Sequence, residues 1–417
     1  MFPPIAYFRS WGALPEWTSI LTLLGVIRRV HIKNSLTFNA NVTTSAPKGR
    51  VGTLLLDPTN IYIATDQASA TSAGMVTTDT SAGTGAPNFT AVGAVQDSLL
   101  TVTDLQLALV ANAVSVTTAN ASGTGIGNIK VVNPVNWDGS TYSLTLTAAN
   151  NIVVDASLQT AAVGGGDITL TAGNQITLNA PLISTSNATP NGKVTLTAGN
   201  GGIASGASGT VTALNLGISS SGNVSLPNGN TFSTVAGTIT GDLNLNNTLG
   251  YSIGSVNAID GITASGTVTL HAVDAVTQTK PISAIGLELT GTGAGSYTLT
   301  GANSVGILAA NVQSGFSFTN AGALEIGTVG SNSGVTAGSV TLNAGGALTT
   351  AAAATVKSDN ITIQSTAAGQ VGTEASLFAT EAATTSTAFT IGNAAFLGGY
   401  FDHTDAAALS TVSLAAN

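Results

Sequence analysis

Leu144-Thr-Leu-Thr-Ala-Ala-Asn-Asn-Ile-Val-Val154 is the first of three closely similar stretches that decide the fold. The second reads Ile168-Thr-Leu-Thr-Ala-Gly-Asn-Gln-Ile-Thr-Leu178, and the third reads Val194-Thr-Leu-Thr-Ala-Gly-Asn-Gly-Gly-Ile203. Their first residues are 24 and 26 positions apart. Weaker copies and a last fragment begin at Val268, Val340 and Ile361. Self-similarity at such a period is typical of solenoid proteins, in which repeated units stack along one axis.

Within one unit, apolar and polar residues alternate as they do in a strand with one buried face. Ile168 and Leu170 point to one side, and Thr169 and Thr171 point to the other. The pair Gly173-Asn174 then interrupts the strand, because both residue types tolerate left-handed backbone. The alternation resumes afterwards. The unit therefore reads as strand, tight corner, strand and looser loop, with one apolar side throughout.

A single unit of this size is too small to be stable alone. Its few buried aliphatic side chains gain no more free energy than the ordering of about 25 residues costs. Stacking changes this balance, because each unit then covers the apolar face of its neighbour. We therefore predict a right-handed parallel β-helix with coils of about 20–26 residues. Aliphatic residues fill its core, and threonine and asparagine lie on the outside.

The composition supports an all-β class. Only 7% of the 417 residues are charged, whereas 43% are hydrophobic. Ordinary soluble domains contain about 25% charged residues, and the abundant threonine and valine favour strands. With a net charge of −9 and only 10 Lys and Arg residues, the chain lacks the basic clusters that bind nucleic acid. The absence of cysteine suits a large exported bacterial protein.

The chain divides into four predicted parts. The first part, residues 1–34, has two tryptophans, four of the ten basic residues and a short apolar run, Ile20–Ile27, that we expect to be a strand or short helix. Leu99–Val116 is rich in Leu and Ala and predicts a short helix lying over the rod. The parts are an atypical or capping segment at 1–34, an early β-helix at 35–142 with a polar insertion near 66–90, regular repeats at 143–365, and degenerate coils or a cap at 366–417.

The repeats, together with Gly52-Thr-Leu-Leu-Leu-Asp-Pro-Thr-Asn-Ile61 and Asn133-Pro-Val-Asn-Trp137, resemble filamentous haemagglutinin-like adhesins. These adhesins are the exported passengers of two-partner secretion systems. The resemblance covers about residues 35–365. It implies a secreted or surface-exposed adhesin shaft, which attaches to receptors or glycans on host or bacterial surfaces.

The same resemblance implies an outer-membrane transporter as the secretion partner. The family's Asn-Pro-Asn motifs and its long signal peptide are missing from this sequence. We therefore expect an internal or truncated piece of a longer adhesin, whose transporter-binding domain lies outside it.

A carbohydrate-active enzyme is the main alternative, because parallel β-helices also serve as polysaccharide lyases and glycoside hydrolases. Such sites need clustered carboxylates with a cationic partner. The acids here are scattered, and the densest polar group is Asp402-His403-Thr404-Asp405. A solvated loop explains this group better than a metal site does. We therefore predict a chain that is not an enzyme, with no catalytic, cofactor-binding or metal residues. The scattered acids are Asp57, Asp138, Asp155, Asp167, Asp242, Asp260 and Asp359.

The remaining motifs also favour structural roles. The three histidines, His31, His271 and His403, are far apart, and alternation places His271 on the outside. Gly164-Gly-Gly-Asp167 is a single copy of a pattern that binds calcium only when it repeats, so we predict a turn. Gly123-Thr-Gly-Ile-Gly127 has no following lysine or helix pattern and is not a phosphate loop.

Overall fold

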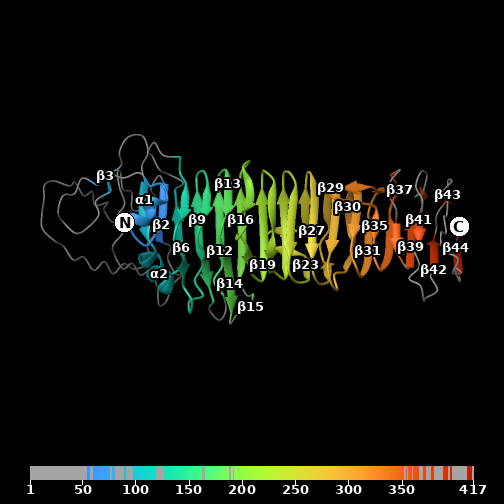
Figure 1. The fold of residues 1–417 in the computed structure, drawn as a ribbon, viewed down its shortest axis with the longest axis horizontal. Helices are drawn as coiled ribbons and strands as arrows, with labels where there is room; N and C mark the ends of the chain where they lie inside the picture. The colour runs from blue at the N-terminus through green and yellow to red at the C-terminus, as the bar shows by residue number, and fades with distance from the viewer. Residues whose placement is uncertain are drawn as a thin grey trace, which may run out of the picture.

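In the computed structural model, short strands are stacked side by side into an elongated rod (Figure 1). The fold is all-β, and most of the strands pair in parallel. Thirty-three of the strands belong to one sheet that runs along the rod. The structure describes residues 60–75, 97–118, 126–161, 165–186, 192–351, 354 and 356–358, together with the backbone of the further strands named below.

The N-terminal end of the rod combines strands with two helices (Figure 1). Its elements are β1 (Leu54–Leu56), β2 (Asn60–Ala64), α1 (Gln67–Ser72), β3 (Thr78–Asp79), β4 (Phe89–Thr90), β5 (Asp97–Thr101), α2 (Val102–Ala111), β6 (Val114–Thr117), β7 (Ile129–Val131) and β8 (Val135–Asn136). The region predicted as one helix, Leu99–Val116, is therefore a strand, a helix and a second strand. Helix α2 begins where the Thr101 hydroxyl accepts a hydrogen bond from the Asp104 amide, 3.1 Å away, as N-cap residues do.

The helices are short. Among the described residues, we find no helix with the length and apolar character needed to cross a membrane.

The central part holds the three clear repeats, and each repeat supplies three strands. The first has β9 (Leu144–Ala148), β10 (Ile152–Val154) and β11 (Leu158–Thr160). The second has β12 (Ile168–Ala172), β13 (Gln175–Leu178) and β14 (Leu182–Ser186), followed by β15 (Thr189–Pro190). The third has β16 (Lys193–Ala198), β17 (Gly202–Ser205) and β18 (Val211–Thr212).

Apart from β15, which pairs antiparallel with β14, the strands of each repeat pair in parallel with the corresponding strands of the next. Leu144 lies opposite Ile168, and Ile168 lies opposite Val194. This register is the alignment that the sequence repeats predict, so that prediction is confirmed. The second and third strands of each repeat are paired in the same way.

The ladder continues beyond the clear repeats. Its next strands are β19 (Asn215–Ser220), β20 (Val224–Asn230), β21 (Thr234–Ile239), β22 (Leu243–Asn247), β23 (Tyr251–Ile253), β24 (Ser255–Val256), β25 (Ile259–Asp260), β26 (Ile262–Ala264), β27 (Thr267–Ala272), β28 (Val276–Gln278), β29 (Ile282–Gly291) and β30 (Tyr297–Asn311). From the clear repeats onward, parallel partners on neighbouring strands are separated by as few as 17 residues, as for Asn230 and Asn247, and by as many as 29, as for Leu182 and Val211. This range of separations is wider than the 20–26 residues predicted for one coil.

The last strands are β31 (Gly315–Asn320), β32 (Leu324–Ile326), β33 (Thr328–Val329), β34 (Asn332–Ser333), β35 (Val335–Thr336), β36 (Ser339–Ala344), β37 (Leu348–Thr350), β38 (Val356–Ser358), β39 (Asn360–Ser365), β40 (Gln370–Val371), β41 (Leu377–Ala379), β42 (Ala388–Gly392), β43 (Ala395–Phe396) and β44 (Thr411–Ala415). The weaker copies at Val268, Val340 and Ile361 are all strands of the ladder, as predicted. Strand pairing crosses the predicted part boundaries, from β6 to β9 and from β39 to β42.

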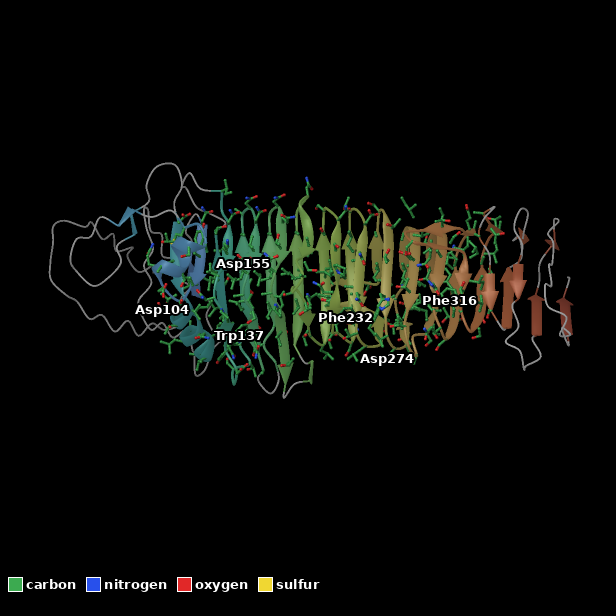
Figure 2. The ribbon with its side chains drawn as sticks, viewed as in Figure 1. Asp104, Trp137, Asp155, Phe232, Asp274 and Phe316 are labelled. Carbon is green, nitrogen blue, oxygen red and sulfur yellow. The ribbon has the colours of Figure 1, made fainter. Side chains whose placement is uncertain are left out.

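The core follows the predicted alternation. In β12, Ile168, Leu170 and Ala172 are buried, and the two intervening threonines are partly exposed. One continuous cluster of buried apolar side chains runs from Ile61 to Val356. The aromatic residues Trp137, Phe232 and Phe316, labelled in Figure 2, are almost fully buried at three places along the rod.

The prediction that asparagine lies on the outside is wrong at six of the described positions, and four of these lie in the ladder beyond the clear repeats. Asn230, Asn247 and Asn303 are fully buried, and Asn320 is nearly so. The side chain of Asn303 accepts a hydrogen bond from the Ile282 amide at 2.7 Å and donates to the carbonyls of Leu299 and Thr319. These amides stay inside because they satisfy backbone groups that would otherwise be buried without partners.

We predict that Leu170→Ala lowers the free energy of unfolding by about 2–5 kcal/mol, because it leaves a cavity in a packed core. Leu170 is fully buried between its ladder partners Leu146 and Leu196. The matched control is Thr171→Ala on the outer face of the same strand, which changes stability by about 0.5 kcal/mol or less. Urea unfolding followed by circular dichroism measures both. Equal effects of the two variants would contradict the inside-outside assignment.

Candidate contact surface

Two short antiparallel hairpins leave the parallel ladder and return to it. Hairpin 1, Gly254–Gly261, contains β24 and β25, and hairpin 2, Gly327–Gly334, contains β33 and β34. In each hairpin, the amide of the last glycine donates to the carbonyl of the first at 2.8 Å. The strand on either side of each hairpin stays paired with the preceding strand of the ladder. Each hairpin is thus an insertion into one continuous layer of the rod.

The two hairpins are equivalent parts of an internal repeat. Ile253-Gly-Ser-Val256 corresponds to Ile326-Gly-Thr-Val329, and Gly261-Ile-Thr-Ala264 corresponds to Gly334-Val-Thr-Ala337. The two tips also share an unusual backbone, with φ of 55° at Asn257 and 58° at Gly330. The buried asparagines follow the same offset, because Asn230 matches Asn303 and Asn247 matches Asn320.

Both hairpins lie flat against the outside of earlier strands. Val256 packs on Gly217 and is only 3% exposed, and Val329 packs on Gly286 and is 4% exposed. A Cβ atom on Gly217 or Gly286 would stand 3.1 Å from a methyl group of the covering valine. The strand positions beneath the hairpins therefore need residues without side chains or with very small ones. Ala236 and Ala309 are also fully buried, each in a strand beside its hairpin.

The tips of the hairpins are anchored by different polar contacts. The Asn257 side chain in hairpin 1 donates to the Thr195 hydroxyl at 3.1 Å. In hairpin 2, one oxygen of the Glu288 carboxylate accepts from the Ser331 amide at 2.8 Å, the Ser331 hydroxyl at 2.9 Å and the Asn332 side chain at 2.7 Å. Its other oxygen accepts from the Thr269 hydroxyl at 3.0 Å.

The carboxylate beneath hairpin 2 is held in its charged form. Burial alone would raise the pKa of Glu288, but the hydrogen bonds from Ser331, Thr269 and Asn332 outweigh burial and lower that pKa below its ordinary value. A carboxylate that accepts several hydrogen bonds is stabilised in this way. Glu288 therefore acts as a charged anchor for the tip.

Three of the sequence-predicted acids form ion pairs with lysines instead of meeting one another. Asp155 lies 3.2 Å from Lys130, Asp167 lies 3.3 Å from Lys193, and Asp260 lies 3.0 Å from Lys280. Asp155, labelled in Figure 2, also accepts a hydrogen bond from the Asn179 side chain. All three pairs are partly exposed, so each contributes little to stability.

The other predicted residues are equally dispersed. The carboxylate of Asp242 accepts from the Thr267 amide and hydroxyl, and Asp138 is exposed. His271 lies on the outer side of β27, as predicted, where its ring nitrogen is 2.9 Å from the Thr290 hydroxyl and partial burial lowers its pKa. Gly165 has a φ of 53°, which fits the turn predicted for Gly164–Asp167. Over the described residues, histidine and acidic side chains do not gather in groups of three or more that could hold a metal ion.

The remaining predicted residues lie outside the described residues. They are Asp57, Asp359, His31 and the group Asp402-His403-Thr404-Asp405. Most of Gly123–Gly127 lies outside as well, although Gly127 is described and has a φ of 75°. The predictions for these positions are untested.

Comparison of the chain with protein-family models, curated proteins and solved structures finds no match in any of the three.

The hairpins and the Glu288 anchor are the surface features that the sequence predictions missed. A signal for them exists, because Ile-Gly-Ser/Thr-Val and Gly-Ile/Val-Thr-Ala both recur with the same separation. A second signal is the small residues Gly217, Ala236, Gly286 and Ala309 on strands whose neighbours carry threonine at outward positions.

We predict that Asn303→Ala lowers the free energy of unfolding by about 1–3 kcal/mol, because it leaves buried backbone groups without a partner. The control is Asn244→Ala, an asparagine on the exposed side of β22, where the same change leaves stability almost unchanged. Urea unfolding curves measure both variants. The role assigned to the buried asparagines is wrong if Asn303→Ala is as harmless as Asn244→Ala.

The pKa of Glu288 also predicts a pH dependence. Because the pKa is lower in the folded state, the anchor's contribution is full above the unfolded-state value of about 4.3 and is lost as the pH falls through the folded-state value. We expect hydrogen-exchange protection at the Ser331 and Asn332 amides to fall in that acidic range.

In Glu288→Gln, protection at these two amides should be lower at neutral pH and nearly independent of pH. Asp138→Asn, which removes an exposed carboxylate elsewhere, serves as the control and should behave like the wild-type chain. Wild-type protection that stays constant across the acidic range would contradict the anchor.

Proposed function

We propose that the strands wind into a right-handed parallel β-helix. The support is the recurrence of three strands in each repeat, with every strand paired in parallel to its counterpart in the next repeat. A chain that returns to a parallel neighbouring strand in this way makes right-handed connections in about 98% of cases. The coils then vary in length with the spacing of the ladder partners.

We further propose that this β-helix is the non-catalytic shaft of a secreted or surface-exposed bacterial adhesin. The observation that carries the proposal is the unbroken ladder with one continuous core, which gives a stiff rod of small cross-section. The strands of each layer are hydrogen-bonded to those of the next along the ladder, so the shaft resists local unfolding and proteolysis. Its outer face is rich in threonine, serine and asparagine, which supply many weak polar contacts.

The proposed partners follow from the resemblance of the sequence to filamentous haemagglutinin-like adhesins. An outer-membrane transporter of a two-partner secretion system would export the chain, and receptors or glycans on host or bacterial cells would be its targets. The hairpins are the features best suited to direct contact, because each adds a second layer to the outside of the rod and has an exposed tip. Asn257, Ala258, Gly330 and Ser331 are exposed there.

Attachment of coated beads tests this proposal. Beads carrying the purified chain are mixed with cultured epithelial cells and with bacterial cells, and bound beads are counted as the coating density rises. We expect saturable attachment. Beads carrying Leu170→Asp, which places a charge in the core and disrupts the coil, should attach poorly. Beads carrying Thr171→Asp, with the same charge on the outer face, should attach nearly as well as the wild-type chain.

The same protein is then incubated with a panel of polysaccharides, and new reducing ends or unsaturated products are measured. A non-catalytic shaft should release neither new reducing ends nor unsaturated products. Polysaccharide cleavage without attachment to any cell type would contradict the adhesin and favour the carbohydrate-active enzyme.

A further inference from the structure

Six threonines form a regular array on one face of the rod. They are Thr145 and Thr147 in β9, Thr169 and Thr171 in β12, and Thr195 and Thr197 in β16, where Lys193 also points outward at the start of the strand. The register sets Thr145, Thr169 and Thr195 in one column and Thr147, Thr171 and Thr197 in a second. We call these six residues the threonine array.

The spacing of the array is fixed in two directions. Neighbouring strands lie roughly 4.8 Å apart, and residues two positions apart in a strand are separated by roughly 6.7 Å. Branching at Cβ restricts the χ1 angle of threonine, so the hydroxyl and methyl groups have little freedom. Behind the array, Leu146, Leu170 and Leu196 are fully buried and hold the three strands in place.

The six members of the array are open and uncharged, and the ion pair of Lys193 with Asp167 borders the array on one side. All six threonines are partly exposed. In the part of the chain that the structure describes, Thr195 is the one member whose hydroxyl bonds another side chain, that of Asn257 at the tip of hairpin 1. Hairpin 1 also covers Gly217 in β19, the strand that follows β16 in the ladder. The array therefore ends where the hairpin cover begins.

The chemistry of the array disfavours two common kinds of ligand. A stable protein partner generally needs about 800 Å² on each side, with aromatic or arginine anchors, whereas the array consists of six small side chains. Small molecules generally bind in concave sites, whereas these side chains stand on one face of a sheet. A regular grid of uncharged side chains with little freedom fits a ligand that is itself a periodic solid.

We infer that the threonine array binds the surface of ice. The water molecules of an ice face repeat in two dimensions on the scale of this grid, so several hydroxyls can take up lattice positions at once. Each threonine hydroxyl both donates and accepts a hydrogen bond, as a lattice water does. The methyl groups between them order the adjacent water. This activity is independent of the adhesion proposed above.

Inhibition of ice recrystallisation by the full chain tests the inference. We expect the wild-type chain to keep ice grains small during annealing below the melting point. Thr171→Lys places a long, charged side chain in the array and should abolish the effect. The matched control is Thr177→Lys, the same change in the same repeat on the outward side of β13, which should retain it. Circular dichroism and unfolding curves are used to check that both variants fold.

A second pair of variants keeps the inference testable if the lysine substitutions unfold the chain. Thr171→Ser removes only a methyl group and Thr171→Val removes only the hydroxyl, and we expect each to weaken the inhibition without abolishing it. Three outcomes would overturn the inference. They are a wild-type chain without effect on ice, equal losses in Thr171→Lys and Thr177→Lys, and retention on insoluble chitin or cellulose in place of ice.

Discussion

The structure depends on parallel strand pairing in register, because this pairing stacks corresponding residues directly above one another. Leu144, Ile168 and Val194 form one inward column, and Leu216 and Val235 continue it. With strands roughly 4.8 Å apart, each inward side chain must fit the residues before and after it. Branched aliphatic residues satisfy this condition at nearly every layer. The outward columns inherit the same regularity, which is why threonines also stand in rows.

Departures from this regularity are stabilised by polar groups. At Asn230 and Asn303 the register of the ladder shifts, and the buried amides satisfy the backbone groups that the shift leaves without strand partners. At the hairpins the outer face changes instead, because glycine and alanine replace threonine where a second layer lies on the strand. The rod can therefore carry insertions on its outside without interrupting its core.

The sequence predicts the ladder well and the insertions poorly. The copies at Leu144, Ile168 and Val194 share most of their residues, so both strand positions and register can be read from them. The hairpin repeat keeps only the residues that its geometry requires, such as Gly254 and Gly327, while Val224 and Tyr297 or Pro227 and Thr300 differ freely. Asn230 and Asn303 each follow an inward leucine by four residues. Because asparagine is polar, the sequence predicts that their side chains are exposed. Only their hydrogen bonds reveal why they are buried.

Engineered disulfides test the register most directly, because the chain contains no cysteine. Thr171 and Thr197 are partners on neighbouring strands, and the roughly 4.8 Å spacing of paired strands falls within the roughly 4.4–6.8 Å between Cα atoms that a disulfide spans. The double variant Thr171→Cys with Thr197→Cys should therefore oxidise readily in the folded chain. Thr171→Cys with Thr195→Cys, which is displaced by two residues, should remain reduced under the same conditions. Faster oxidation of the displaced pair would contradict the in-register ladder on which this account rests.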